Sequence, residues 1–260
     1  MTAYARDLIG ARELLLAWTS RNLRARYQQS LLGWLWAIVQ PVAQVLIFSF
    51  IFTRVVPVDT GGVPYVVFSY VAVTPWTFLA SSLTDMSSSL VYNMSLVNKI
   101  YFPREVLVLS AMLARFMDFL ISAALLVVLM VIYQVPFTLV ALLYLPVILL
   151  VQFALIIGLG LALAAGNVFF RDVQSLLTLG IQLWFYASPI LYPVTAVPEN
   201  LRTLYFLNPM AGILESYRDV LINGQAPGGY LWVAAGISLV ILVAGYTFFK
   251  RVEFRFADIV

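Results

Sequence analysis

Six long apolar segments make up most of this sequence, and they constrain its fold more than any other feature. About 20 consecutive apolar residues form a helix that crosses the roughly 30 Å of hydrocarbon in a bilayer. Because lipid offers the backbone no hydrogen-bond partners, segments of this kind must be helical. We therefore expect an all-α integral membrane protein with six transmembrane helices. Their approximate bounds are 33–52, 64–83, 105–133, 137–166, 173–192 and 230–249.

The composition excludes a soluble fold and several classes of enzyme. Of the 260 residues, 63% are apolar and only 10% are charged, whereas about a quarter of the residues in a soluble domain carry charge. The sequence contains no Cys and no His, which excludes disulfide frameworks, His-bearing metal sites and Ser-His-Asp triads. It also lacks the G-x-x-x-x-G-K-[ST] loop that cradles nucleotide phosphates. We expect no cofactor in this chain and no catalytic activity of its own.

The distribution of basic residues predicts the orientation in the membrane. Eleven Lys and Arg residues lie on the side of the spans that holds both termini, and three lie on the other side. Positive charge is retained on the cytoplasmic face of membranes, so we expect both termini in the cytoplasm. The net charge of +3 then reflects topology rather than nucleic-acid binding. We divide the chain into an interface region (1–32), a transmembrane domain (33–252) and a cytoplasmic tail (253–260).

Two regions outside the six spans have helical patterns. Up to about Ser30, an apolar arc and several arginines predict an amphipathic helix in the cytoplasmic interface, with arginine side chains reaching anionic headgroups. A cytoplasmic arm away from the membrane is the alternative. Between spans five and six, Asn208 and Pro209 form an N-cap and N1 pair, and Pro198 opens a shorter helical piece. We expect two short outer-leaflet helices, with an exposed hairpin cap as the alternative.

Charged residues within the membrane are the usual pointers to function. Arg115 and Asp118 are spaced i, i+3 on the third segment and are predicted to form an internally neutralised structural pair. Asp85 lies in a Ser/Thr-rich run, which we interpret as the place where the second helix leaves the hydrocarbon. An ion-coupled carrier that uses Asp85 and Asp118 is an alternative function. A membrane-embedded transferase would need clustered acidic or His residues, and the sequence shows no such cluster.

Aromatic residues gather on the fifth segment, where Trp184, Phe185, Tyr186 and Tyr192 surround the pair Ser188-Pro189. Many membrane aromatics form belts at the lipid interface, and that explanation stays open for these four. Aromatic faces also pack well on the C–H faces of sugars. A pore lining along which a carbohydrate slides is therefore the functional interpretation.

The loop between the second and third segments has the features of a docking site. Pro103 ends any helix at about Phe102, which leaves a short amphipathic helix at the membrane face. Tyr101 and Phe102 are large side chains of the kind that fill a groove on a partner. A loop of this kind, on a chain without a nucleotide-binding motif, indicates that the energy source is on another chain.

Four motifs in sequence order resemble those of one known family. They are Arg24-x-Arg26-Tyr27-x-x-Ser30-x-Leu32-Gly33-x-x-Trp36 followed by Pro41; Asn98-Lys99-Ile100-Tyr101-Phe102-Pro103-Arg104-Glu105; Phe169-Phe170-Arg171-Asp172 followed by Ser188-Pro189-Ile190-x-Tyr192-Pro193; and Asn208-Pro209-Met210 leading to Glu215-x-x-Arg218. In this order and spacing, the chain resembles the permease subunit of a type-2 ABC exporter. It is most similar to the branch that exports lipid-linked polysaccharides such as O-antigen, capsule or teichoic acid.

The resemblance implies partners, a location and site residues. It implies a bacterial cytoplasmic membrane complex of two permeases with two ATPase subunits, which would hold the ATP and Mg²⁺. ATPase contacts would come from Asn98, Lys99, Tyr101, Phe102, Pro103 and Arg104, and from Arg24, Arg26 and Tyr27 of the interface helix. Candidate channel or gate residues are Trp36, Trp184, Phe185, Tyr186 and Tyr192. Drug exporters share the fold, so export of a small hydrophobic compound remains an alternative.

Overall fold

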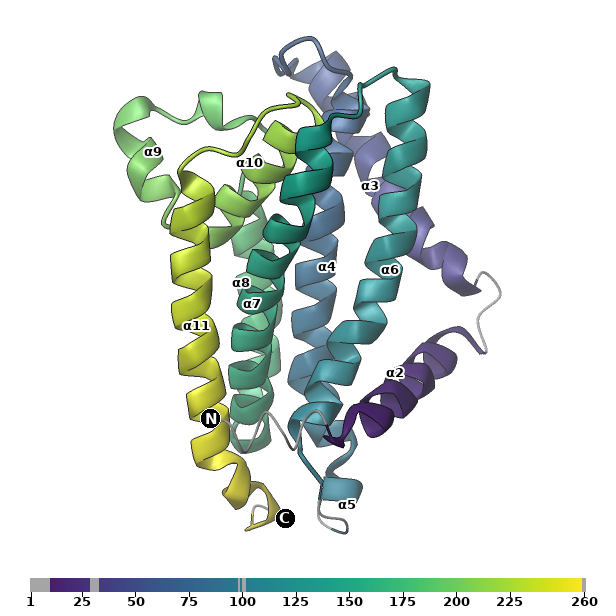
Figure 1. The fold of residues 1–260 in the computed structure, drawn as a ribbon, viewed down its shortest axis with the longest axis vertical. Coiled ribbons are helices and arrows are strands. Elements are labelled where there is room, and N and C mark those ends of the chain that lie inside the picture. The colour runs from purple at the N-terminus through teal and green to yellow at the C-terminus, as the bar shows by residue number, and fades with distance from the viewer. Residues whose placement is uncertain (1–9, 29–32, 98, 100–101, 259–260) are drawn as a thin grey trace.

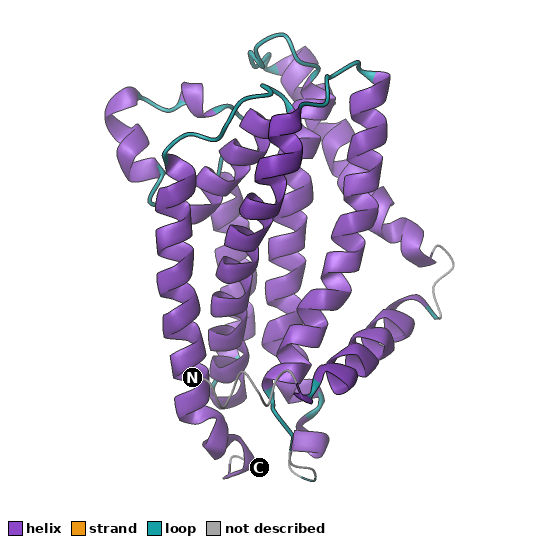
Figure 2. Ribbon diagram, in the orientation of Figure 1, coloured by secondary structure: helices purple, strands orange, loops and turns teal. Residues whose placement is uncertain are grey.

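A computed structural model describes residues 10–28, 33–97, 99 and 102–258, and this part of the chain contains helices and loops but no strand (Figures 1 and 2). The helices are α2 (Arg12–Tyr27), η1 (Gly33–Leu35), α3 (Trp36–Phe50), η2 (Ile51–Val55), α4 (Tyr65–Tyr92), α5 (Met94–Val97), α6 (Glu105–Ile132), α7 (Leu139–Phe169), α8 (Asp172–Tyr186), η3 (Val194–Ala196), α9 (Glu199–Tyr205), α10 (Pro209–Leu221), α11 (Tyr230–Val252) and η4 (Glu253–Asp258). The prediction of an all-α fold is confirmed.

Five of the described helical segments are long and apolar enough to cross a membrane: Gly33–Val55, α4, α6, α7 and the run Tyr230–Phe256. The fifth predicted span differs. It is represented by α8, which has 15 residues and is about 22 Å long at 1.5 Å per residue. The chain leaves the helix after Tyr186, just before Ser188-Pro189, because proline disfavours a helical residue in front of it. A sixth crossing therefore stays a prediction.

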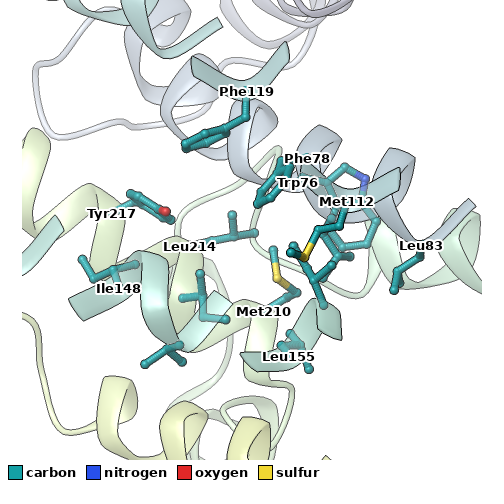
Figure 3. Close-up of a cluster of buried hydrophobic side chains, with 14 of the residues drawn as sticks. Trp76, Phe78, Leu83, Met112, Phe119, Ile148, Leu155, Met210, Leu214 and Tyr217 are labelled. Carbon is teal, nitrogen blue, oxygen red and sulfur yellow. The ribbon is translucent and has the colours of Figure 1, made fainter. Parts of the chain in front are cut away.

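Helix α4 is the centre of the bundle. In its most apolar stretch 78% of the residues are buried, against 11% for Gly33–Val55, and it packs against α3, α6, α7, α8 and α10. Figure 3 shows the core around it, where Trp76 and Phe78 of α4 meet Met112 of α6, Leu155 of α7 and Leu214 of α10. The expected second span (64–83) corresponds to the first part of this helix, which continues to Tyr92.

The two ends of the bundle carry different short elements (Figure 1). One end holds α5, η4 and the lower part of α2, and we name it the α5 end. The other holds α9 and the loops that follow α3 and α6, and we name it the α9 end. Helix α10 is not a surface cap: it packs against α4, α7 and α11, and twelve of its thirteen residues are buried. The alternative of an exposed hairpin cap is wrong for this helix.

Candidate transport path and coupling surfaces

Four charged side chains from three helices meet near the α5 end. Arg26 of α2 lies 2.6 Å from Asp85 of α4 and 2.7 Å from Asp118 of α6. Arg115 of α6 lies 2.7 Å from Asp85 and 3.3 Å from Asp118. We name these four residues the charge cluster. The predicted Arg115–Asp118 contact is present, but it is one side of a four-membered network rather than an isolated pair.

The charge cluster corrects the expected role of Arg26. Its guanidinium does not extend toward lipid headgroups but contacts two carboxylates, because paired acids in an apolar bundle hold a planar cation strongly. The hydroxyl of the neighbouring Tyr27 donates to Asp118. Burial, with a further contribution from this hydrogen bond, raises the pKa of Tyr27 to about 12. The phenol is therefore protonated at neutral pH and acts as a donor.

Helix α2 is fixed along its length to the bundle. Asn22 donates to Ser110 Oγ at 3.1 Å, and Arg21 donates to Asn93 Oδ1 at 3.2 Å. Helix α2 also packs against α6, so it is part of the bundle; its position at the membrane interface stays a prediction. Arg24, another predicted ATPase contact, is exposed and leaves a charged surface at the α5 end.

A cavity of about 270 Å³ lies between α2, α3, α4 and α6, beside the charge cluster. Its lining combines aromatic, amide, hydroxyl and charged side chains. They include Tyr27, Trp36, Gln40, Thr77, Ser81, Arg115 and Asp118. A second, more open hollow of about 360 Å³ shares Gln40, Thr77, Ser81 and Arg115 with it and extends to Trp76 and Thr84. The predicted residue Trp36 thus lies at the wall of a polar crevice between α3 and α4.

Helices α3 and α8 leave most of their surfaces uncovered. Helix α8 has no buried side chain, and α3 buries only Pro41 and Val45. The uncovered faces are not purely apolar, since the amides of Gln40 and Gln182 and the hydroxyl-bearing Thr178 are exposed. We name the exposed residues Ser175, Thr178, Gln182 and Tyr186 the α8 stripe.

The predicted gate aromatics divide into two groups. Trp184 and Phe185 face the bundle: the Trp184 indole donates to Asn208 Oδ1 at 2.7 Å, and both rings pack edge-on against Trp76 at centroid distances of 5.8 and 5.7 Å. Tyr186 points outward and is 61% exposed. Tyr192 donates to the Tyr186 carbonyl at 3.1 Å and fixes the turn that ends α8. Of the predicted gate aromatics, Tyr186 and Trp36 are thus exposed, whereas Trp184, Phe185 and Tyr192 are partly buried.

The α9 end contains a buried arginine, the last residue of the fourth sequence motif. Arg218 of α10 is 3% exposed, contacts Glu215 at 3.3 Å and donates to the Ile190 carbonyl at 3.1 Å. Its guanidinium lies 3.9 Å from the ring centroid of Phe68. The carbonyl of Ile190, directly after Ser188-Pro189, could not be identified as its partner from spacing alone. Arg218 thus ties the turn after α8 to α10 and α4.

Part of the predicted docking loop lies outside the described residues, namely Asn98 and Tyr101. Lys99 is exposed, while Phe102, Pro103 and Arg104 are partly buried. Phe102 packs against the core of its own chain, and its contact with a partner stays a prediction. The expected helix in this loop is limited to α5.

Comparison with known proteins places this architecture in a family. The family described as ABC-2 type transporter matches residues 13–222. The chain belongs to the ABC-2 type transporter family. An O-antigen export system permease protein RfbA of Myxococcus xanthus is 33% identical over 262 residues, covering 99% of both chains. A protein of the same name from Klebsiella pneumoniae is 32% identical over 247 residues, covering 95% of both.

A more distant relative is a protein named for the transport of another polysaccharide. The polysialic acid transport protein KpsM of Escherichia coli is 26% identical over 239 residues, covering 90% of this chain and 91% of that protein. The family match begins in α2 and ends directly after α10. It therefore includes the charge cluster, the α8 stripe and the buried Arg218.

Proposed function

We propose that this chain is the permease subunit of an ATP-driven exporter that moves a lipid-linked polysaccharide across the bacterial cytoplasmic membrane. In the proposal, two copies form one channel and two partner ATPase subunits supply the energy. The observation that carries it is the uncovered surface of α3 and α8, where the polar and aromatic side chains of Gln40, Thr178, Gln182 and Tyr186 are exposed. The relatives named for O-antigen export and polysialic acid transport support the same substrate class.

The polar residues on these surfaces argue against contact with lipid. An amide without a hydrogen-bond partner in hydrocarbon costs several kcal/mol by transfer scales. Gln40 and Gln182 are both exposed on helices that are mainly apolar. Facing water in a channel, or a second copy of the chain, avoids this cost. We therefore place α3 and α8 at a two-fold axis with the channel between them.

The channel surface suits a glycan better than a small hydrophobic compound. Sugars bind through C–H contacts with aromatic rings and through hydrogen bonds with hydroxyl and amide groups. The exposed ring of Tyr186, together with Thr178 and Gln182, supplies both kinds of contact. A few weak, repeated contacts allow a chain to slide, whereas a drug site is a deeper and mainly apolar pocket.

Energy would enter at the α5 end, which we propose is cytoplasmic. The sequence has no phosphate-binding loop, so ATP hydrolysis is assigned to the partner subunits. Closure of those subunits on ATP would push on residues 98–104 and on exposed Arg24. Because the charge cluster joins α2 to α4 and α6, such a push would change how α3 and α8 pack at the axis.

The test is reconstitution of the purified chain, its partner ATPase and an isolated lipid-linked glycan in proteoliposomes. We expect ATP-dependent appearance of glycan on the far side of the membrane, and no ATP hydrolysis by the chain alone. Transport of a hydrophobic dye without transport of glycan would favour the drug-exporter alternative. ATP hydrolysis by the isolated chain would contradict the division of labour.

A further inference from the structure

The C-terminal segment Glu253–Phe256 lies under the α5 end of the bundle, where it meets parts of the chain far from it in sequence. Figure 1 shows the C-terminus at the same end as α5. Phe256 and Glu253 are buried, while Phe254 between them is 68% exposed. A segment that buries its first and last side chains is docked on the bundle rather than extended into solvent.

Phe256 fills the space between the ends of two long helices. Its ring centroid lies 5.7 Å from that of Phe249 in α11 and 5.9 Å from that of Phe169, the last residue of α7. The guanidinium of Arg104 lies 5.6 Å from the same ring. One fully buried side chain therefore contacts both the end of the predicted docking loop and the end of α7.

A charged contact accompanies the aromatic one. Lys250 of α11 contacts Glu105, the first residue of α6, whose side chain is 3% exposed. Lys250 also lies 3.2 Å from Glu253. The first turn of α6, which directly follows the docking loop, is thereby attached to α11 and to the segment that contains Phe256.

These contacts join two loops that are far apart in the sequence. Residues 98–104 connect α5 to α6, and residues 170–171 connect α7 to α8. The helices that follow and precede these loops, α6 and α7, also pack against each other and against α4, and the C-terminal segment adds a connection between the two loops themselves through Phe256. With it, a displacement of the docking loop reaches the end of α7 through one packed ring. Packed side chains and ion-pair networks of this kind can carry energetic coupling between two sites.

We propose that Phe256 and Lys250 are positioning residues for export, which transmit movement of the docking loop to the α7–α8 turn and so to the α8 stripe. This inference rests on the proposed function, since it presumes a partner ATPase that acts on residues 98–104. It concerns only how the movement is passed on. The segment itself is assigned no contact with the ATPase or with the glycan.

The test compares Phe256→Ala with Phe254→Ala in the reconstituted complex of permease and ATPase. We expect Phe256→Ala to assemble and hydrolyse ATP at close to the unaltered rate, with glycan exported per ATP lowered by about tenfold, within the range of coupling energies between sites. Phe254→Ala, whose exposed ring lies in the same segment, is expected to keep the unaltered ratio. A second variant, Lys250→Met, should lower the ratio in the same direction, and Lys250→Arg should restore it.

The possible outcomes are distinct. Export per ATP at the unaltered ratio in both Phe256→Ala and Lys250→Met would overturn the proposal. It would also be overturned if ATP hydrolysis and export fell together, because the segment would then be a docking surface. If neither variant assembled with the ATPase, the segment would have only a structural role, and the proposal would be overturned as well. If the unaltered complex exports no glycan, the proposed function fails instead.

Discussion

The charge cluster is neutral because its two arginines balance its two aspartates. Each side chain is only 15–26% exposed, so removal of one partner leaves an uncompensated charge in a place with little water. Breaking a fully buried pair costs about 3–5 kcal/mol, whereas exposed pairs are worth about 0–1 kcal/mol. The charge cluster is partly buried, so the cost of breaking one of its pairs lies between these two values.

The first prediction concerns Asp118→Asn. The substitution leaves Arg26 and Arg115 facing a single carboxylate, and we expect a loss of stability of about 1–3 kcal/mol, measured as a lower melting temperature in detergent. Glu199→Gln is the control, because Glu199 is 89% exposed in its contact with Arg202 and its loss should have little effect. If both substitutions lowered the melting temperature equally, the charge cluster would not stabilise the protein more than an exposed ion pair does.

Substitution of Asp118, together with that of Asp85, also distinguishes the proposed exporter from an ion-coupled carrier. A carrier that uses Asp85 and Asp118 would lose transport in Asp85→Asn and Asp118→Asn even when compared at equal amounts of folded protein. In the exporter, the two carboxylates hold α2 in place and take no part in coupling to an ion. We therefore expect the remaining folded protein to export glycan in an ATP-dependent manner.

The second prediction concerns Asp219 of α10, which is 4% exposed. It accepts hydrogen bonds from Asn223 at 3.3 Å, Gln225 at 3.1 Å and the hydroxyl of Tyr230. Asp219→Ala leaves three donors without this acceptor and should cost about 1–3 kcal/mol, measured by thermal unfolding. Asp219→Asn should cost less, because its carbonyl still accepts and the Tyr230 hydroxyl can accept from its amide.

Titration gives a second readout for the Asp219 substitutions. Burial raises the pKa of Asp219 above its ordinary value of 3.8. Stability from such a group is full below the unfolded pKa and is lost as the pH rises through the folded pKa. The melting temperature of the unaltered protein should therefore contain a fall above pH 3.8 that Asp219→Asn lacks. An identical pH profile for both proteins would contradict this reading of the site.

Among the elements, apolar length predicted the existence of the long helices, but it did not show that α4 continues as a helix through its polar run to Tyr92. Ser87, Ser88 and Ser89 satisfy their hydroxyls by donating to carbonyls of the preceding turn, which a helix tolerates at some cost. Asp85 is satisfied by two arginines from other helices. A polar run can thus mark a protein-facing part of a helix, and a single sequence does not distinguish this from a helix end.

The third prediction tests the contact between α7 and α11, where the helices approach through glycines. A Cβ on Gly245 would lie 2.0 Å from the carbonyl oxygen of Gly158, and a Cβ on Gly158 would lie 2.6 Å from the backbone of Ile241. Small residues permit such close packing of membrane helices. We expect Gly245→Ala to force the helices apart and lower stability by about 1–3 kcal/mol.

Gly236 on the same helix provides the matched control. It is exposed, and a Cβ there would meet nothing within 4 Å. Gly236→Ala should leave the melting temperature unchanged or raise it, since alanine favours the helix by up to about 1 kcal/mol. If Gly245→Ala were as stable as Gly236→Ala, the helices would not be in close contact at this place.

For the whole molecule, features that depend on local sequence were predicted better than contacts between residues far apart in the chain. The position of the docking loop and the aromatic content of α8 follow from local patterns of a few residues. The partners of Arg26 do not, because they are 59 and 92 positions away in the chain. Contacts of that separation depend on how the helices pack, and ion pairs between helices leave no periodic signal in one sequence. The arrangement of the charge cluster therefore required the structure.

The last prediction concerns the assembly of two copies. The chain has no Cys, so single cysteines can be introduced without a background of native thiols. If α8 faces the axis, Gln182→Cys in membranes should give a cross-linked dimer with a flexible bismaleimide. Leu150→Cys on α7, where the native side chain is 68% exposed, should remain monomeric, because a leucine surface is suited to lipid whereas an exposed glutamine is not. Dimers from Leu150→Cys with none from Gln182→Cys would move the subunit contact to α7 and leave the α8 stripe without its proposed role.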